Sequence, residues 1–164
     1  MRRAAWPPIS ALTIVVALIA VGSAVRAESA LVRTQAEFQT ALGRLTPGDT
    51  LTLADGEWRD FEIDFAACGA VDRPITLTAQ TPGGVTITGR SYLKMAGEHL
   101  VVSNLVFRDG WSPTGEVLSF RRSLTERANF SRITRVVIDD SSHPDRAASD
   151  NRAACAFRPS AAAA

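Results

Sequence analysis

The sequence has almost no lysine: of its 18 basic residues, Lys94 is the only lysine. It has two cysteines and one tyrosine. This composition excludes a disulfide-dense mini-protein, a collagen-like repeat and a charged disordered tail. With 18 basic and 17 acidic residues, it lacks the basic excess of a nucleic-acid-binding protein. The chain has 164 residues, of which 46% are hydrophobic. This length and this hydrophobic fraction fit one domain of ordinary size.

Residues 1–27 have the order of a secretory signal peptide: an arginine pair, an apolar run over 11–21, and small residues. Small residues favour cleavage after Ala27, with Ala24 as the alternative. The apolar run is shorter than the roughly 20 residues of a membrane span, so an export signal is favoured over an anchor. The sequence therefore predicts a secreted or periplasmic protein that has no membrane partner once the signal is removed.

Export changes the charge and the expected cysteine chemistry. Removing Arg2, Arg3 and Arg26 lowers the basic count from 18 to 15, against 17 acidic residues. In an oxidising compartment Cys68 and Cys155 are compatible with one disulfide. Their separation in sequence does not give their distance, and we favour the alternative that Cys68 is a small buried side chain.

A helix is expected over residues 34–45. Thr34 and Glu37 have the spacing of a capping box, and the apolar positions that follow recur every three or four residues. The Pro-Gly-Asp sequence at 47–49 ends the helix.

Beyond this helix the sequence predicts only strands. Short apolar or alternating runs are separated by turn signals; they cover 50–53, 61–65, 75–79, 85–88, 93–96, 99–103, 105–108, 117–120 and 133–138. Comparable strands open 24 and 25 residues apart at Leu51, Ile75 and Leu100, and 24 and 20 apart at Phe61, Val85 and Leu105. This spacing is typical of a β-solenoid. A sandwich would favour short hairpin turns, and the Asp-Gly at 109–110 suits a longer loop. We predict an all-β, right-handed parallel β-helix of roughly four coils, capped by the N-terminal helix.

An ordered series of segments carries a family resemblance. The segments are PGDTLTLADGEW at 47–58, DRPITLTA at 72–79, TPGGV at 81–85, ITG at 87–89, GEHLVV at 97–102, LVF at 105–107, EVLSFR at 116–121, RIT at 132–134 and VIDD at 137–140. This series resembles the N-terminal part of polysaccharide lyase family 6, the alginate lyase and chondroitinase B group, over residues 31–146.

The resemblance implies a right-handed parallel β-helix that cleaves uronic-acid polysaccharides by β-elimination. In the family, Ca²⁺ neutralises the uronate carboxylate, a Lys removes the C5 proton and an Arg assists the leaving oxygen. The implied partner is an anionic polysaccharide, alginate or a glycosaminoglycan.

The family's catalytic residues lie on coils that this chain is not expected to reach. Lys94 alternates with Leu93 and Met95, which predicts a solvent-facing strand position rather than a base. We assign no catalytic or metal residue; the substrate-binding residues are unknown, and Ca²⁺ is expected for the full-length family with no ligand assignable in this chain.

The family pattern is lost together with strand periodicity at the C-terminal end. We expect the lyase-like domain to cover residues 28–146 and an irregular Ala- and Arg-rich tail to cover 147–164. We hypothesise a lost reading frame near Asp145 or a truncated gene. The absence of family-like Lys, Arg and acidic strands from the other frames of the downstream DNA would contradict this.

Other residues with binding chemistry have structural explanations that are as good or better. Arg90, Arg121 and Arg122 could bind an anionic chain, but a solvated face is favoured. Asp139 and Asp140 are favoured as turn caps over Ca²⁺ ligands, because adjacent strand residues face opposite ways.

The remaining candidates are two histidines and three aromatic residues. His99 and His143 lack partners at a spacing that would indicate a base. Trp58, Trp111 and Phe120 could stack on sugars, but a core or coil-edge role is at least as good an explanation.

Three functions therefore stay open: the N-terminal part of a lyase that is inactive alone, a non-catalytic polysaccharide-binding β-helix, and an unrelated extracellular solenoid. An uncapped C-terminal coil would make the product poorly soluble or dimeric.

Overall fold

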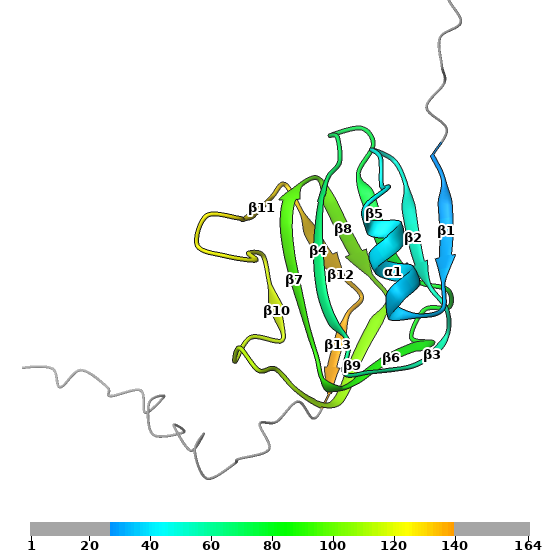
Figure 1. The fold of residues 1–164 in the computed structure, drawn as a ribbon, viewed down its shortest axis with the longest axis vertical. Helices are drawn as coiled ribbons and strands as arrows, with labels where there is room; N and C mark the ends of the chain where they lie inside the picture. The colour runs from blue at the N-terminus through cyan, green and yellow to red at the C-terminus, as the bar shows by residue number, and fades with distance from the viewer. Residues whose placement is uncertain (1–26, 140–164) are drawn as a thin grey trace, which may run out of the picture.

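The computed structural model describes residues 27–139, which form a parallel β-solenoid with one short helix (Figure 1). This confirms the predicted fold class. The predictions for the signal peptide, for the tail, and for Asp140, His143 and Cys155 concern residues outside this described part, and they stay predictions.

Three parallel sheets make up the solenoid. Sheet A contains β1 (Ser29–Val32), β2 (Thr50–Leu53), β5 (Ile75–Ala79), β8 (Leu100–Ser103) and β12 (Arg132–Thr134). Sheet B contains β3 (Gly56–Arg59), β6 (Val85–Arg90), β9 (Leu105–Trp111) and β13 (Val137–Asp139). Sheet C contains β4 (Glu62–Cys68), β7 (Tyr92–Glu98), β10 (Leu118–Ser119) and β11 (Ala128–Asn129).

Each turn of the solenoid contributes to sheets A, B and C in that order. Three such turns are described, and β12 and β13 begin another. In the third turn the sheet C strand is divided, because β10 and β11 pair with different parts of β7. The segment between them, residues 120–127, protrudes from the solenoid (Figure 1).

Alternation along the strands places the core inside the solenoid. In β2 and β4, Leu51, Leu53, Ile63 and Phe65 are fully buried, while the polar residues between them are half-buried. Because successive strand residues point to opposite faces, the same alternation that buries the core presents a row of polar side chains on the outside of each sheet.

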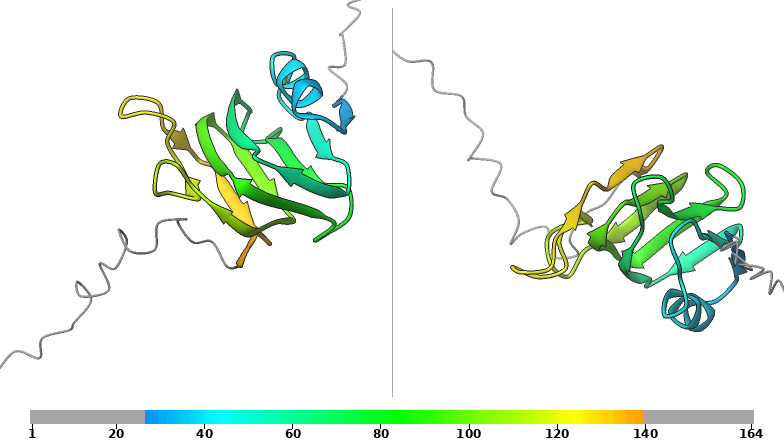
Figure 2. Two further views of the ribbon diagram at one scale, coloured as in Figure 1. Left: turned by 60° about the horizontal axis from the view of Figure 1, so that its bottom comes forward. Right: turned by 90° about the horizontal axis from the view of Figure 1, so that it is seen from above.

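Helix α1 (Gln35–Leu42) lies at the N-terminal end of the solenoid (Figure 2). Thr34 caps it, with its hydroxyl accepting from the Glu37 amide at 3.1 Å. Glu37 reaches back to the Arg33 amide at 2.7 Å, one residue before the position expected for a capping box. The helix ends at Leu42, three residues earlier than predicted. Among the described residues, no helix is long and apolar enough to cross a membrane.

Of the two predicted strand series, the first is confirmed, because β2, β5 and β8 are neighbours in sheet A, with Leu51 opposite Leu77 and Ile75 opposite Leu100. The second is correct only in part: Val85 pairs with Leu105. Phe61 belongs to no strand and precedes sheet C, so it does not continue the Val85 series. That position is taken by β3, whose mainly polar sequence contains one buried residue and gave no strand signal.

Two residues with positive φ explain two further differences from the prediction. Arg135 (φ 52°) divides the single strand predicted over 133–138 into β12 and β13. Asp109 (φ 49°) lies within β9, where the pairing with β6 shifts register, so the loop predicted at 109–110 is instead an irregular part of a strand.

Candidate functional site

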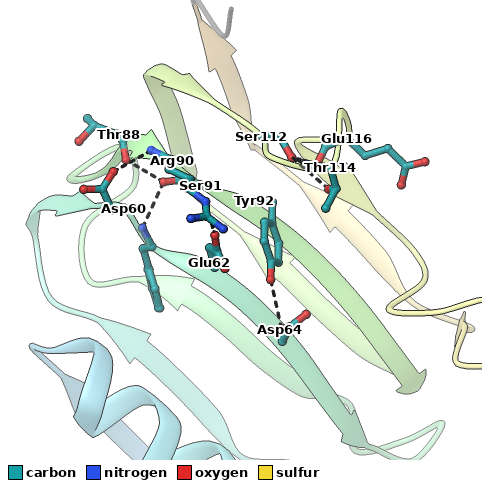
Figure 3. Close-up of polar contacts among 11 residues, drawn as sticks. Asp60, Glu62, Asp64, Thr88, Arg90, Ser91, Tyr92, Ser112, Thr114 and Glu116 are labelled. Carbon is teal, nitrogen blue, oxygen red and sulfur yellow. Dashed lines mark hydrogen bonds and ion pairs between the residues drawn. The ribbon is translucent and has the colours of Figure 1, made fainter. Parts of the chain in front are cut away.

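The outer face of sheet C carries a group of polar side chains that includes carboxylates and a phenol (Figure 3). We define the sheet C face as Glu62 and Asp64 of β4 with Tyr92 and Lys94 of β7. The register places Glu62 beside Tyr92 and Asp64 beside Lys94. Their neighbours in sequence, including Ile63 and Leu93, are fully buried, which fixes the polar side chains on the outside.

The corner before β7 is tied to the previous turn by hydrogen bonds. The Ser91 hydroxyl donates to the Thr88 carbonyl at 2.7 Å and accepts from the Phe61 amide at 3.2 Å. Asp60 accepts from the Arg90 amide at 2.8 Å, and the Arg90 guanidinium lies 2.8 Å from the Glu62 carboxylate. These bonds hold Arg90 and the start of β7 against β4.

Tyr92 is nearly buried and donates its hydroxyl to Asp64 Oδ2 at 3.3 Å. Burial, followed by the negative charges of Asp64 and Glu62, raises the pKa of Tyr92 to about 12. The phenol is therefore a hydrogen-bond donor, and not an anion, throughout the neutral range.

Lys94 lies with its ammonium 4.5 Å from the centre of the Tyr92 ring, a cation–π contact. It forms no ion pair within 4.0 Å among residues 27–139. Beside it, Asp64 Oδ1 is buried and has no hydrogen-bond partner among those residues. The sheet C face thus holds one cation without a carboxylate partner next to one acceptor without a donor.

Three residues of the third turn lie at the border of the sheet C face: Glu116, Ser119 and Arg121. Ser119 pairs with Lys94 in register, and Arg121 lies 3.0 Å from the Glu116 carboxylate. A hydrogen bond from Ser119, then the hydrogen bond and charge of Arg121, hold the pKa of Glu116 below its usual value, and the charge of Lys94 acts in the same direction. Glu116 therefore remains an anion at neutral pH.

The protruding segment at residues 120–127, here called the arginine loop, adds positive charge next to this border. It contains three arginines and one glutamate and is closed by the antiparallel bridge between Arg121 and Arg127. Arg122 pairs with Glu126 at 3.2 Å. Because the loop is exposed, these pairs are open to solvent and to exchange with an anionic ligand.

The raised pKa of Tyr92 gives a direct test of this geometry. Tyr92 is the only tyrosine in the chain, so an ultraviolet titration reports its ionisation alone among tyrosines. We expect a midpoint near 12 and a lower one in Asp64→Asn, because that change removes a negative charge next to the phenol. Since the folded pKa lies above the unfolded value of 10.0, this group should lose its stabilising contribution as pH rises from about 10 to about 12. A midpoint near 10 in the folded protein would contradict the contact with Asp64.

The structure places the predicted residues in different environments. Lys94 faces outward, as its alternation predicted. Arg90, Arg121 and Arg122 each lie in an ion pair on the surface, in agreement with the solvated face that we favoured. Trp58 is buried and stacks on Phe61 with 4.9 Å between ring centres, so it belongs to the core.

The prediction for Cys68 is wrong. Cys68, the last residue of β4, is exposed rather than buried, because the alternation of buried and half-buried residues ends before it. Asp139 accepts from Arg108 across sheet B, at 3.2 Å from Nε. A turn for it to cap would lie beyond residue 139, outside the described part, so that expectation stays a prediction.

His99 and Phe120 have structural positions at corners and loops. His99 occupies a corner with φ 52° and stacks on Phe130 with 5.2 Å between ring centres. Phe120 is 46% exposed at the base of the arginine loop, and Trp111 is half-buried at the end of β9.

The described residues do not fit a calcium site. No three of their His, Cys, Asp or Glu side chains gather in a way that could hold a metal ion. On the sheet C face, Glu62 is paired with Arg90 and Asp64 accepts from Tyr92, whereas Ca²⁺ needs six to eight oxygen ligands.

A cavity of about 510 Å³ lies between α1 and strands β1 and β2. Its buried acid is already engaged in hydrogen bonds that hold the fold together. This acid, Asp49, accepts from the Glu28 amide and from the Thr46 amide and hydroxyl. Burial raises the pKa of Asp49, but these donors together hold it below its usual value. Asp49 is thus a structural link between β1 and the chain that follows the helix.

Comparisons with known proteins agree on one family. Residues 32–158 match the family described as Chondroitinase B. A comparison with curated proteins gave no match.

Solved structures of polysaccharide lyases are similar to this chain, and three of them illustrate the likeness. The alginate lyase AlyGC of polysaccharide lyase family 6 is 53% identical with a TM-score of 0.70, over 71% of this chain and 16% of that one. A mannuronic acid specific family 6 lyase from human gut microbiota is 31% identical (TM-score 0.67), over 71% of this chain and 27% of that one. A family 6 polysaccharide lyase from Pseudopedobacter saltans is 28% identical (TM-score 0.57), over 66% and 24%.

This chain therefore spans 16% to 27% of the length of these solved relatives. The family match covers most of the sequence, and the solved relatives share the fold of the described coils. The chain belongs to polysaccharide lyase family 6, the chondroitinase B and alginate lyase family.

Proposed function

We propose that this chain binds a uronic-acid polysaccharide, of the alginate or glycosaminoglycan type, and provides the N-terminal coils of a lyase that cleaves it by Ca²⁺-assisted β-elimination. The observation that carries this proposal is the 53% identity to an alginate lyase over 71% of the chain. The unpaired cation on the sheet C face supports it, since such a polymer presents carboxylates at regular intervals, on each sugar in alginate and on every second sugar in a glycosaminoglycan.

The described coils are proposed to bind the polymer without cleaving it. Abstraction of the C5 proton needs a base, and the carboxylate next to that carbon must be neutralised for the proton to be acidic. Lys94 lies over the Tyr92 ring, and the nearby Arg90 and Arg121 are each held by a carboxylate. No metal-holding cluster accompanies them in residues 27–139.

The test uses the full chain with alginate, chondroitin sulfate and neutral dextran, in the presence of Ca²⁺. We expect alginate or chondroitin sulfate, but not dextran, to retard the protein in affinity electrophoresis. We expect no rise in ultraviolet absorbance from an unsaturated product. Absence of binding to both acidic polymers would refute the proposal. Clear turnover would refute the claim that this chain binds the polymer without cleaving it.

A further inference from the structure

We propose that Lys94, Asp64 and Tyr92 form a subsite for a single carboxylated sugar, in which Lys94 binds the carboxylate and Asp64 Oδ1 accepts a ring hydroxyl. This inference rests on the proposed function and names three residues that would recognise the polysaccharide. Nothing in the chemistry requires the sugar to be cleaved at this place.

The first support is the state of Lys94. An ammonium group on a protein surface usually lies near a carboxylate when one is available, and Asp64 is its direct neighbour in the sheet. Lys94 instead lies over the Tyr92 ring, 4.5 Å from its centre, with no ion pair within 4.0 Å in residues 27–139. The contact with the ring holds the charge while leaving its donors for an incoming carboxylate.

The second support is the state of Asp64. Its Oδ2 accepts from the Tyr92 hydroxyl, while its Oδ1 is buried without a partner among the described residues. A buried acceptor without a donor is unfavourable by roughly 1–3 kcal/mol. Oδ1 has almost no exposed surface, so a ligand hydroxyl reaches it only when the carboxylate turns outward. The hydrogen bond gained then recovers this free energy, and sugars supply such hydroxyls on adjacent carbons.

The third support is the rigidity of the three residues. Tyr92 and Lys94 are on β7, the central strand of sheet C, which pairs with β4 on one side and with β10 and β11 on the other. Asp64 is on β4, which pairs with β7 alone among the described strands. The Ser91 and Asp60 hydrogen bonds fix the start of β7. The backbone of the subsite is therefore formed before the ligand arrives, which limits the ordering that binding requires.

The charge around the subsite favours one class of sugar. A neutral sugar gains only the Asp64 hydrogen bond, whereas a uronate also gains a charge-assisted bond to Lys94. Of the nearby carboxylates, Glu62 is paired with Arg90 and Glu116 with Arg121, which lowers their repulsion of an incoming carboxylate. The arginine loop adds positive charge at the border of the third turn. The geometry therefore selects carboxylated over neutral chains.

The experiment measures binding of the full chain to two probes by calorimetry. One is a saturated mannuronate tetrasaccharide, and the other is the same chain with its carboxyl groups reduced to alcohols. For Lys94→Gln we expect the Kd for the acidic probe to rise about tenfold and the Kd for the reduced probe to stay unchanged. The affinity of this variant for the acidic probe should also depend less on salt concentration. For Asp64→Ala we expect both probes to bind more weakly, because both carry the hydroxyl. Thermal unfolding of each variant confirms that it is folded.

Arg132→Gln is the matched control, since it removes an exposed positive charge from sheet A. It should leave binding of both probes unchanged. If the wild type binds the acidic probe and Lys94→Gln binds it equally well, or if Lys94→Gln weakens both probes to the same extent, the subsite is wrong. If the wild type binds neither the acidic probe nor alginate, the proposed function itself fails.

Discussion

Replacement of Gly97 by alanine is expected to destabilise the domain by about 3 kcal/mol or more. Gly97 lies near the end of β7 with φ 110°, a backbone conformation that favours glycine. A Cβ at this position would overlap the carbonyl oxygen of Ala67 on the neighbouring strand β4. Because the obstacle is backbone within a parallel sheet, it cannot move without disturbing the pairing of β4 with β7.

The matched control for this variant is Gly83→Ala. Gly83 also has a positive φ, of 79°, but nothing lies within 4 Å of the position that a Cβ would take. It should therefore show the conformational effect alone, about 1 kcal/mol. Chemical denaturation of both variants measures the difference, and equal free energies of unfolding would contradict the close approach of β4 and β7.

Phe61→Ala is the second change for which we expect a large effect, about 3–5 kcal/mol. Phe61 is almost fully buried between the capping helix and the first corner of the solenoid. Its ring stacks on Trp58 and meets the Phe38 ring edge-on, with centres 4.9 Å and 5.1 Å away. The truncation leaves a cavity at the junction of α1, β3 and β4, where three elements would have to move together to close it.

Phe120→Ala controls for the loss of an aromatic side chain as such. Phe120 is 46% exposed at the base of the arginine loop, and its truncation should change stability by no more than about 0.5 kcal/mol. Thermal and denaturant unfolding of both variants give the comparison. A small effect of Phe61→Ala would mean that α1 does not cap the core through this cluster.

The sequence was sufficient for the fold class because solenoid strands depend on local alternation. Residues 50–53 and 75–79 were predicted with their true bounds, since each is an alternating run bounded by turn residues. Weak strands escaped prediction: β3 has one buried residue, and β11 has only two residues in total. These strands form because they make hydrogen bonds with the parallel strand beside them, and the local sequence does not show which strand that is.

Register was less predictable than the strands themselves. Leu51 pairs with Leu77 and Ile75 pairs with Leu100, so paired residues are not separated by the same number of residues in successive turns of the solenoid. The spacing of the strands therefore indicates which strands are neighbours but not which residues are opposite each other. Cys68 was misplaced for a related reason, because the alternation that buries Phe65 ends before the last residue of β4.

The candidate site shows the same division between local and tertiary information. Alternation placed Lys94 on the outside of its strand, as observed. It could not show that Tyr92 would hold Lys94 and donate to Asp64, because Asp64 is 30 residues earlier in the chain and meets Lys94 only through the pairing of β4 with β7. Functional side chains that gather across turns become visible only when the register is known.

The central claim is that the sheet C face binds a uronate chain, and nuclear magnetic resonance of the isotopically labelled full chain tests it most directly. Titration with a saturated mannuronate oligosaccharide should shift the amide signals of Asp64, Tyr92, Lys94 and the arginine loop. The signals of sheet A and of α1 should stay in place. Shifts concentrated on sheet A or around α1, or no shifts at a saturating concentration, would contradict the account.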